Sequence, residues 1–320
     1  MLRRVMAPSS AVGLFCTAVL ILFFAVSALS LPSSTNSSQA RNKTNAERKQ
    51  AEVEKKGDDP KLPTGKEIKK EGKSETKLSQ AETIIEFAII AYGGRKQLET
   101  VRAAASEEGT IKLVTDSGDL SGTYIARSMR RDKSWLDLLR VDLDLNAPAS
   151  TDRSGNDPIK YTVAFNGASV WSAQNGQYIT PKPEAEIAFK AQLTHEYMAL
   201  LRYKEDGSKL EYVGTETVIG VPSNVVDMTT STGEKTRFWV SSKTFRITHA
   251  EYELMLPNQT KATKYRISYF YTPYRVVQNT LVPARREMEQ DGKLVQSIAI
   301  GPVNYSAKFE PEVFQHLQAP

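Results

Sequence analysis

Few residues of this 320-residue chain stand in a pattern that could do chemistry. The three histidines, His195, His249 and His316, are far apart in the sequence. The pair His195-Glu196 begins like the helix of a zinc protease, but the fourth residue after His195 is Ala199, where that motif needs a second histidine. The sequence therefore predicts no transition-metal site.

Motifs for nucleophilic catalysis and phosphate binding do not occur in the sequence either. The single cysteine lies in an apolar N-terminal run, and there is no Gly-x-Ser-x-Gly motif or glycine-rich phosphate loop. Asp142 and Asp144 would share one face of a strand, like paired carboxylates. They alternate with Val141 and Leu143, which is typical of a solvated strand face. We expect neither an enzyme nor a cofactor, and a hydrolase with an unmarked site is the weakest of three hypotheses.

The N-terminus has the features of an export signal. Arg3 and Arg4 precede an apolar run over residues 11–31, which has the order of a secretory signal peptide and about the length that a membrane span needs. Residues 1–31 are thus a signal peptide or an uncleaved N-terminal membrane anchor. In both cases the residues after Pro32 are exported, to the periplasm or to the periplasmic face of the inner membrane.

Residues 32–79 are rich in Lys, Glu, Ser and Asn and contain almost no large apolar side chains. Such a segment cannot bury enough surface to offset the entropy lost on ordering, so it is predicted to be a disordered charged tether. Residues 1–80 hold 14 basic and 8 acidic residues, whereas the remainder holds 28 and 29. The net charge of +5 therefore comes from the N-terminal part, and we expect no nucleic-acid partner.

The elements that must position any site are mostly strands. The run Val163–Ile179 contains two Asn-Gly pairs, at 166–167 and 175–176, each flanked by aromatic and β-branched residues. Asn and Gly tolerate positive φ, so these pairs predict two hairpin turns and three antiparallel strands. Similar turn signals recur as far as Phe314. The folded part is therefore predicted to be mainly one antiparallel sheet of about ten strands.

Two helical segments interrupt this β pattern. Residues 81–105 have a broad apolar face that is broken at Gly93-Gly94, as expected for a helix that ends and is followed by a short second helix. Residues 184–203 form another predicted helix, which ends before Gly207. With strands before and after this helix, the pattern favours a single α+β domain.

Three short patterns resemble the LolA/LolB-like superfamily of periplasmic carriers, which sort lipoproteins to the outer membrane. The first, 165–171, is a turn followed by a tryptophan on the next strand. The second combines the glycine turn at Gly220 with a tryptophan strand over 238–245, and the third is the tyrosine–arginine segment 271–283. The resemblance depends on the order of these three patterns and covers residues 81–316. The chain resembles a distant member of the superfamily.

This resemblance implies the fold and a ligand class. Residues 80–320 would form a half-barrel, which is a single strongly curved antiparallel sheet of about 10–11 strands with helices covering its concave side. Relatives shield lipid or acyl chains in that cavity, although fold alone does not settle function. The polar loop 146–158 and the tether 32–79 depart from the carrier pattern.

The first functional hypothesis is an exported, carrier-like envelope protein that binds a lipid, an acyl chain or a lipoprotein in the hydrophobic cavity. The second is a non-catalytic envelope sensor or scaffold that binds another envelope protein without lipid. Membrane contact would come through the N-terminal segment. For each candidate cavity residue, an ordinary packed core is the alternative. The candidates are apolar and aromatic residues of the predicted strands: Trp135, Leu139, Val141, Leu143, Phe165, Trp171, Trp239, Tyr252, Tyr265, Ile267 and Tyr269.

Overall fold

The computed structural model describes residues 79–116, 118–131, 136–146 and 158–316. The predicted signal or anchor segment 1–31 lies outside the described residues, as do almost all of the predicted tether and most of the loop 146–158. Among the described residues, no helix is long and apolar enough to cross a membrane.

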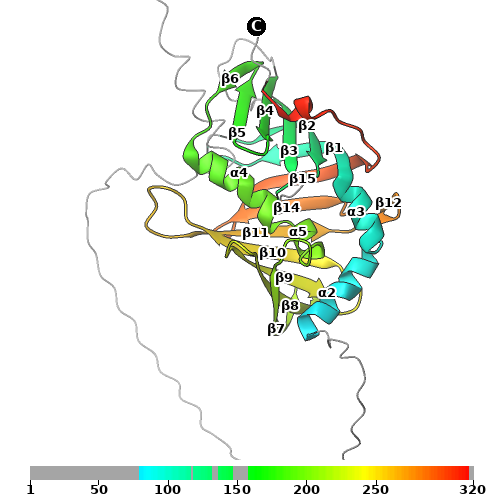
Figure 1. Ribbon diagram of the computed structural model, residues 1–320. Coiled ribbons are helices and arrows are strands. Elements are labelled where there is room, and N and C mark those ends of the chain that lie inside the picture. Colours follow the sequence, from blue (N-terminus) through cyan, green and yellow to red (C-terminus); the bar gives the residue numbers. More distant parts are fainter. Residues whose placement is uncertain (1–78, 117, 132–135, 147–157, 317–320) are drawn as a thin grey trace, which may run out of the picture. The chain divides into compact units, whose positions relative to one another are not determined.

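Thirteen strands form one open antiparallel sheet in the spatial order β6-β5-β4-β3-β2-β1-β15-β14-β11-β10-β9-β8-β7 (Figure 1). β12 (Val276–Val277) and β13 (Thr280–Leu281) form a separate two-stranded ribbon. The strands of the large sheet are β1 (Ala104–Leu113), β2 (Leu120–Met129), β3 (Leu138–Asn146), β4 (Ile159–Phe165), β5 (Val170–Gln174), β6 (Gln177–Ile179), β7 (Lys209–Val218), β8 (Val221–Thr229), β9 (Lys235–Ser241), β10 (Ile247–Leu254), β11 (Thr263–Phe270), β14 (Arg285–Gln290) and β15 (Lys293–Asn304).

The path of the chain explains why helices cover one face. From β1 the strands run outward in sequence order to the edge strand β6, and the chain then crosses to the opposite edge strand, β7. The crossing is made by α4 (Pro183–His195) and α5 (Tyr197–Leu201), after which the strands return inward until β15 pairs with β1. A connection between the two edges of a curved sheet must pass over one face of it.

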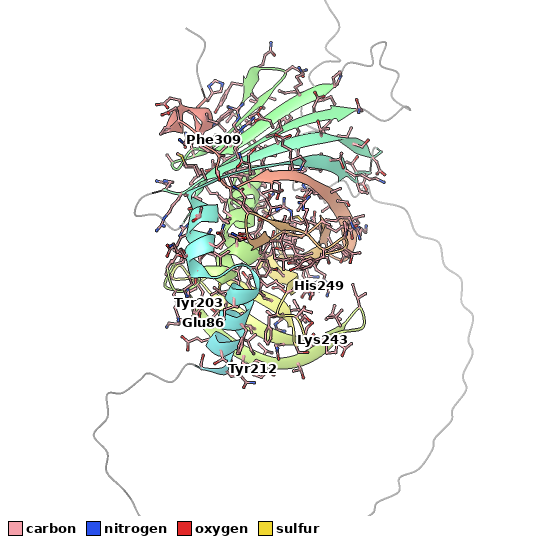
Figure 2. The ribbon with its side chains drawn as sticks, turned by 90° about the vertical axis from the view of Figure 1, so that its right-hand side faces the viewer. Glu86, Tyr203, Tyr212, Lys243, His249 and Phe309 are labelled. Atoms are coloured by element: carbon pink, nitrogen blue, oxygen red, sulfur yellow. The ribbon has the colours of Figure 1, made fainter. Side chains whose placement is uncertain are left out.

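The N-terminal helices lie on the same face. α2 (Gln80–Ala91) and α3 (Arg95–Ala103) precede β1 and lie with α4 and α5 on one side of the sheet, and the strands bend around them (Figures 1 and 2). We call this helix-covered face the inner face and the opposite one the outer face. Tyr203 and Glu86, which lie close together in Figure 2, join the segment after α5 to α2, since the Tyr203 hydroxyl donates to Glu86 Oε1 at 3.1 Å.

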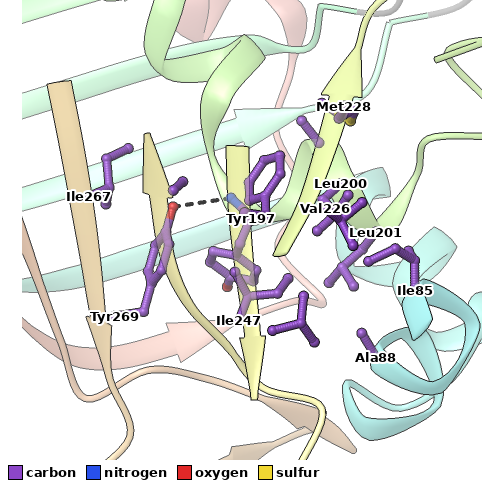
Figure 3. Packing of buried hydrophobic residues seen from close by; sticks show 14 of the residues in the cluster. Ile85, Ala88, Tyr197, Leu200, Leu201, Val226, Met228, Ile247, Ile267 and Tyr269 are labelled. Atoms are coloured by element: carbon purple, nitrogen blue, oxygen red, sulfur yellow. Dashed lines mark hydrogen bonds between the residues drawn. The ribbon is translucent and has the colours of Figure 1, made fainter. Parts of the chain in front are cut away.

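Helix α2 begins where its sequence predicts. Ser79 and Glu82 form a capping box, in which the Ser79 hydroxyl accepts from the Glu82 N–H and the Glu82 carboxylate accepts from the Ser79 N–H. Its buried residues pack with α5 and with β8 to β11 in a core cluster, part of which is drawn in Figure 3. A second cluster joins α4 to β1–β5 and β15. The predicted α+β class with a curved sheet is confirmed, with thirteen strands in place of 10–11.

The two Asn-Gly pairs make different turns. Asn175 and Gly176 have φ values of 50° and 79° and close a two-residue hairpin between β5 and β6. Asn166 opens a four-residue connection between β4 and β5, in which its side-chain oxygen accepts from the backbone N–H groups of Ala168 and Ser169. The predicted three-strand meander is confirmed, and its first turn is longer than a two-residue hairpin.

The predicted helix over 184–203 is broken at Glu196. This residue has an extended backbone (φ −73°, ψ 159°), although neither Gly nor Pro lies at the break. The backbone N–H of Tyr197 donates instead to the Tyr269 hydroxyl at 3.1 Å (Figure 3). A tertiary hydrogen bond thus replaces a helical one, and two shorter helices result.

Candidate ligand cavity

A cavity of about 200 Å³ lies between the inner face of the sheet and the helices α3, α4 and α5. Side chains from β1, β2, β3, β11, β14 and β15 form its floor. Its apolar walls comprise Val101, Ala105, Ile111, Ala126, Leu139, Val141, Leu193, Met198, Ile267, Met288, Ile298 and Val303.

Strand register places these apolar side chains next to one another. Ala126 on β2 stands opposite Val141 on β3, and Val141 stands opposite Val163 on β4. On the other side of the sheet centre, Ile267 stands opposite Met288. Because successive side chains of a strand point to opposite faces, each strand contributes every second residue to the inner face.

One polar group in the cavity wall is centred on Arg286 of β14. Its Nη2 lies 2.6 Å from Glu107 Oε1 and its Nη1 lies 3.1 Å from Glu196 Oε1. Glu107 also accepts a hydrogen bond of 2.7 Å from the Tyr124 hydroxyl. We call Glu107, Tyr124, Glu196 and Arg286 the Arg286 cluster. It connects β1, β2 and β14 with the break between α4 and α5.

Burial dominates the electrostatics of this cluster. It raises the pKa of the Glu196 carboxyl, although the positive charge of Arg286 opposes the shift. It also raises the pKa of the Tyr124 hydroxyl, with the Glu107 charge adding to the effect. Burial alone would lower the pKa of Arg286, but the two carboxylates outweigh it and raise that pKa. Arg286 therefore stays charged, and Tyr124 stays neutral.

A second polar group, the Arg102 cluster, is formed by Arg102, Asp137, Arg202, Glu205 and Asp206. Arg102 Nε lies 3.1 Å from Asp137 Oδ1, and its Nη1 lies 2.6 Å from Glu205 Oε2. Arg202 reaches Asp137 Oδ2 at 3.2 Å and Asp206 Oδ2 at 2.9 Å. Arg102, Asp137 and Arg202 line the cavity, so two charged clusters flank its apolar walls.

The structure brings three of the sequence-predicted cavity residues to the cavity wall, namely Leu139, Val141 and Ile267. Leu143 and Phe165 share the inner face but are packed within the second core cluster. Three tyrosines on β10 and β11 (Tyr252, Tyr265 and Tyr269) lie on the same face in the first core cluster. Tyr252 stacks on His195 of α4 with ring centroids 4.0 Å apart.

The described tryptophans lie on the outer face. Trp171 stands opposite Ala164, which stands opposite Arg140, and its Nε1 donates to the Phe314 backbone oxygen at 2.8 Å. Trp239 stands opposite His249, and its Nε1 donates to Glu216 Oε2 at 2.8 Å. Neither side chain lines the cavity. Trp135 lies outside the described residues.

The charged residues of the cavity stand in no motif that the sequence marks as functional. Glu196 belongs to the failed zinc motif, Arg286 lies within a predicted strand, and Glu107 lies between the predicted helical segment and the first predicted strand. Alternation shows that Arg286 shares a strand face with Met288. It does not show that Glu107 and Glu196, 179 and 90 residues away, pair with Arg286 there.

The paired carboxylates predicted on one strand, Asp142 and Asp144, have different surroundings. Asp142, on the outer face, binds Arg127, Arg140 and the Thr162 hydroxyl, whereas Asp144 is exposed. Within the part of the chain that the structure describes, no group of three His, Cys, Asp or Glu residues is arranged to hold a metal ion.

We expect the stability of the fold to decrease in mild acid because His195 is buried. Its Nδ1 lies 2.6 Å from Thr236 Oγ1, and burial lowers its pKa to about 4. The unfolded value is about 6.5, so between these pH values the unfolded chain binds a proton that the folded chain does not. The free energy of unfolding should therefore fall by about 2 kcal/mol between pH 7 and pH 5 from this group.

Urea unfolding of the wild type and of His195→Gln at the two pH values measures this contribution. Between pH 7 and pH 5, the free energy of unfolding of the variant should fall by about 2 kcal/mol less than that of the wild type. His249, whose pKa burial also lowers to about 4, should retain its own contribution in both proteins. An identical pH dependence in wild type and variant would contradict the assignment.

Several solved structures of other proteins are similar to this chain. No family model matches the chain, and neither does any curated protein sequence. A DUF1329 family protein from Desulfovibrio piger is 14% identical, with a TM-score of 0.48 over 75% of this chain and 98% of its own. A putative outer membrane lipoprotein-sorting protein domain from Vibrio parahaemolyticus is 11% identical, with a TM-score of 0.47 over 73% of this chain and 97% of its own. LprF from Mycobacterium bovis is 9% identical, with a TM-score of 0.26 over 72% of this chain and 97% of its own.

Proposed function

We propose that this protein is an exported, non-catalytic binding module that holds a lipid, an acyl chain or a lipoprotein's acyl chains in its inner-face cavity, in the manner of a carrier. The observation that carries this proposal is the cavity of about 200 Å³ with twelve apolar side chains in its walls. An apolar cavity of about 150 Å³ is enough to bind benzene, so this space can take hydrocarbon.

Burial of the chain would supply the affinity. Transfer of each methylene group from water contributes about 0.8 kcal/mol, so useful binding needs no precisely placed polar contacts along the chain. The hypothesis of a lipid-free scaffold predicts a filled core. The cavity therefore favours the binding module over the scaffold.

The proposed location follows from the sequence. Residues 1–31 would direct export or anchor the chain, and residues 32–79 would connect that segment to the domain that begins at α2. The protein would then act in the periplasm, or at the periplasmic face of the inner membrane if the segment is uncleaved. An apolar ligand that moves between membranes needs such a shield from water.

A cavity-filling substitution tests the proposal. Ala126 lies in the cavity wall on β2, so the larger side chain of Ala126→Leu fills part of the cavity without removing core atoms. We expect saturable uptake of a fluorescent monoacylglycerol ester by the purified full chain, and uptake at least tenfold weaker by Ala126→Leu.

The matched control is Ala173→Leu on β5. Ala173 stands opposite Thr162, which donates to Asp142 on the outer face, so the same enlargement there should leave uptake unchanged. Circular dichroism and urea unfolding confirm that both variants fold. If the wild type shows no saturable uptake, or if Ala126→Leu binds as well as the wild type, the proposed function is wrong.

A further inference from the structure

We propose that the cavity selects acyl chains whose head is uncharged, such as an ester or an amide, and excludes the free fatty-acid anion. This inference rests on the proposed function and names its ligand class. It comes from the way in which the charges around the cavity are paired.

Among the described residues, three arginines line the cavity, and each is bound by at least two carboxylates. Arg286 is bound by Glu107 and Glu196. Arg102 is bound by Asp137 and Glu205, with a longer approach of 4.0 Å to Asp206. Arg202 is bound by Asp137 and Asp206.

The charge balance of each cluster is therefore negative. The Arg286 cluster has two carboxylates for one guanidinium, and the Arg102 cluster has three carboxylates for two guanidinium groups. The remaining carboxylate in the wall, Glu287, is paired with Arg285. Protonation of Glu196 would make the Arg286 cluster neutral but would leave no surplus positive charge. Among the residues that the structure describes, no cation in the wall is free to neutralise an incoming anion.

An anionic head would thus lose its water without gaining a counter-charge. In a partly dehydrated site, an unpaired charge costs several kcal/mol, and neighbouring carboxylates add repulsion. An uncharged carbonyl avoids both penalties and needs only a hydrogen-bond donor. Arg286, which lines the cavity, has one buried donor, Nε, with no hydrogen-bond partner among the described residues.

The test compares matched probes that differ only at the head. Purified full-length chain is titrated at neutral pH with a fluorescent acyl chain as its glycerol ester and as the free acid. We expect the ester to bind at least tenfold more tightly than the acid. Equal or tighter binding of the acid overturns the inference and leaves the proposed function standing, whereas failure of both probes to bind overturns both.

Removing one negative charge should relax the selection. Glu107→Gln should tighten binding of the free acid and so lower the ester-to-acid ratio of affinities several-fold. Asp137→Asn, in the other cluster, provides a second variant should Glu107→Gln fail to fold. Glu251→Gln is the matched control, because Glu251 pairs with Lys264 and Arg266 on the outer face. An unchanged ester-to-acid ratio in the folded cluster variants overturns the inference.

Discussion

Replacing Arg286 by methionine is expected to lower the free energy of unfolding by about 3 kcal/mol. The substitution keeps most of the apolar volume of the side chain but removes the charge that Glu107 and Glu196 share. Two carboxylates would then remain near each other on the inner face. The loss of one partner from a buried ion pair is costly because it leaves uncompensated charge, and here it leaves two.

A rescue variant distinguishes charge from packing. Arg286→Met combined with Glu196→Gln should be more stable than Arg286→Met alone, as measured by urea unfolding at pH 7. Arg266→Met on the outer face is the control, because the Arg266 side chain is 42% exposed and its loss should cost less than about 1 kcal/mol. An equal decrease in the free energy of unfolding in Arg286→Met and Arg266→Met would show that the Arg286 cluster does not stabilise the fold.

Phe314→Ala, in the C-terminal segment, is expected to lower the free energy of unfolding by about 3 kcal/mol. The short 3₁₀ helix η1 (Pro311–Phe314) lies against the outer face of the sheet, where Phe314 is fully buried. Trp171 Nε1 donates to the Phe314 backbone oxygen, and Arg140 donates to the Val313 backbone oxygen at 2.9 Å. Loss of the phenyl ring should weaken this whole attachment and expose Trp171.

Fluorescence reports both consequences. In Phe314→Ala, the urea midpoint should fall, and the tryptophan emission of the folded protein should move to longer wavelength because Trp171 gains solvent. Glu312→Ala on the same turn, whose side chain is exposed, should change neither. A Phe314→Ala variant with wild-type stability and emission would show that the C-terminal segment does not cover Trp171.

The β architecture was predictable because it depends on local chemistry. Asn175-Gly176 supplies the positive φ values of a two-residue turn, and period-2 alternation identifies strands without knowledge of their partners. The break between α2 and α3 was likewise marked by Gly93-Gly94. Each of these signals acts within a few residues.

The features that were missed depend on long-range contacts. Trp171 resembles a residue of the inner face because it is apolar and buried, but its indole N–H donates to the Phe314 backbone oxygen, 143 residues away in the sequence, and its ring contacts His316. The helix break at Glu196 depends on Tyr269 and Arg286, on strands that follow much later. Alternation separates two faces of a strand but does not show which face the helices cover. For this reason the charged clusters of the cavity could not be found from the sequence.

The most direct test of the central claim is to locate a bound chain by photo-crosslinking. The full chain is incubated with a monoacylglycerol ester that carries a diazirine at its methyl end, irradiated, and analysed by peptide mass spectrometry. We predict saturable attachment to cavity-wall residues such as Ala126, Leu139 and Met198, which Ala126→Leu should weaken at least tenfold. Attachment confined to exposed apolar side chains such as Phe87, Ile90 and Ile219 would contradict a ligand site inside the cavity.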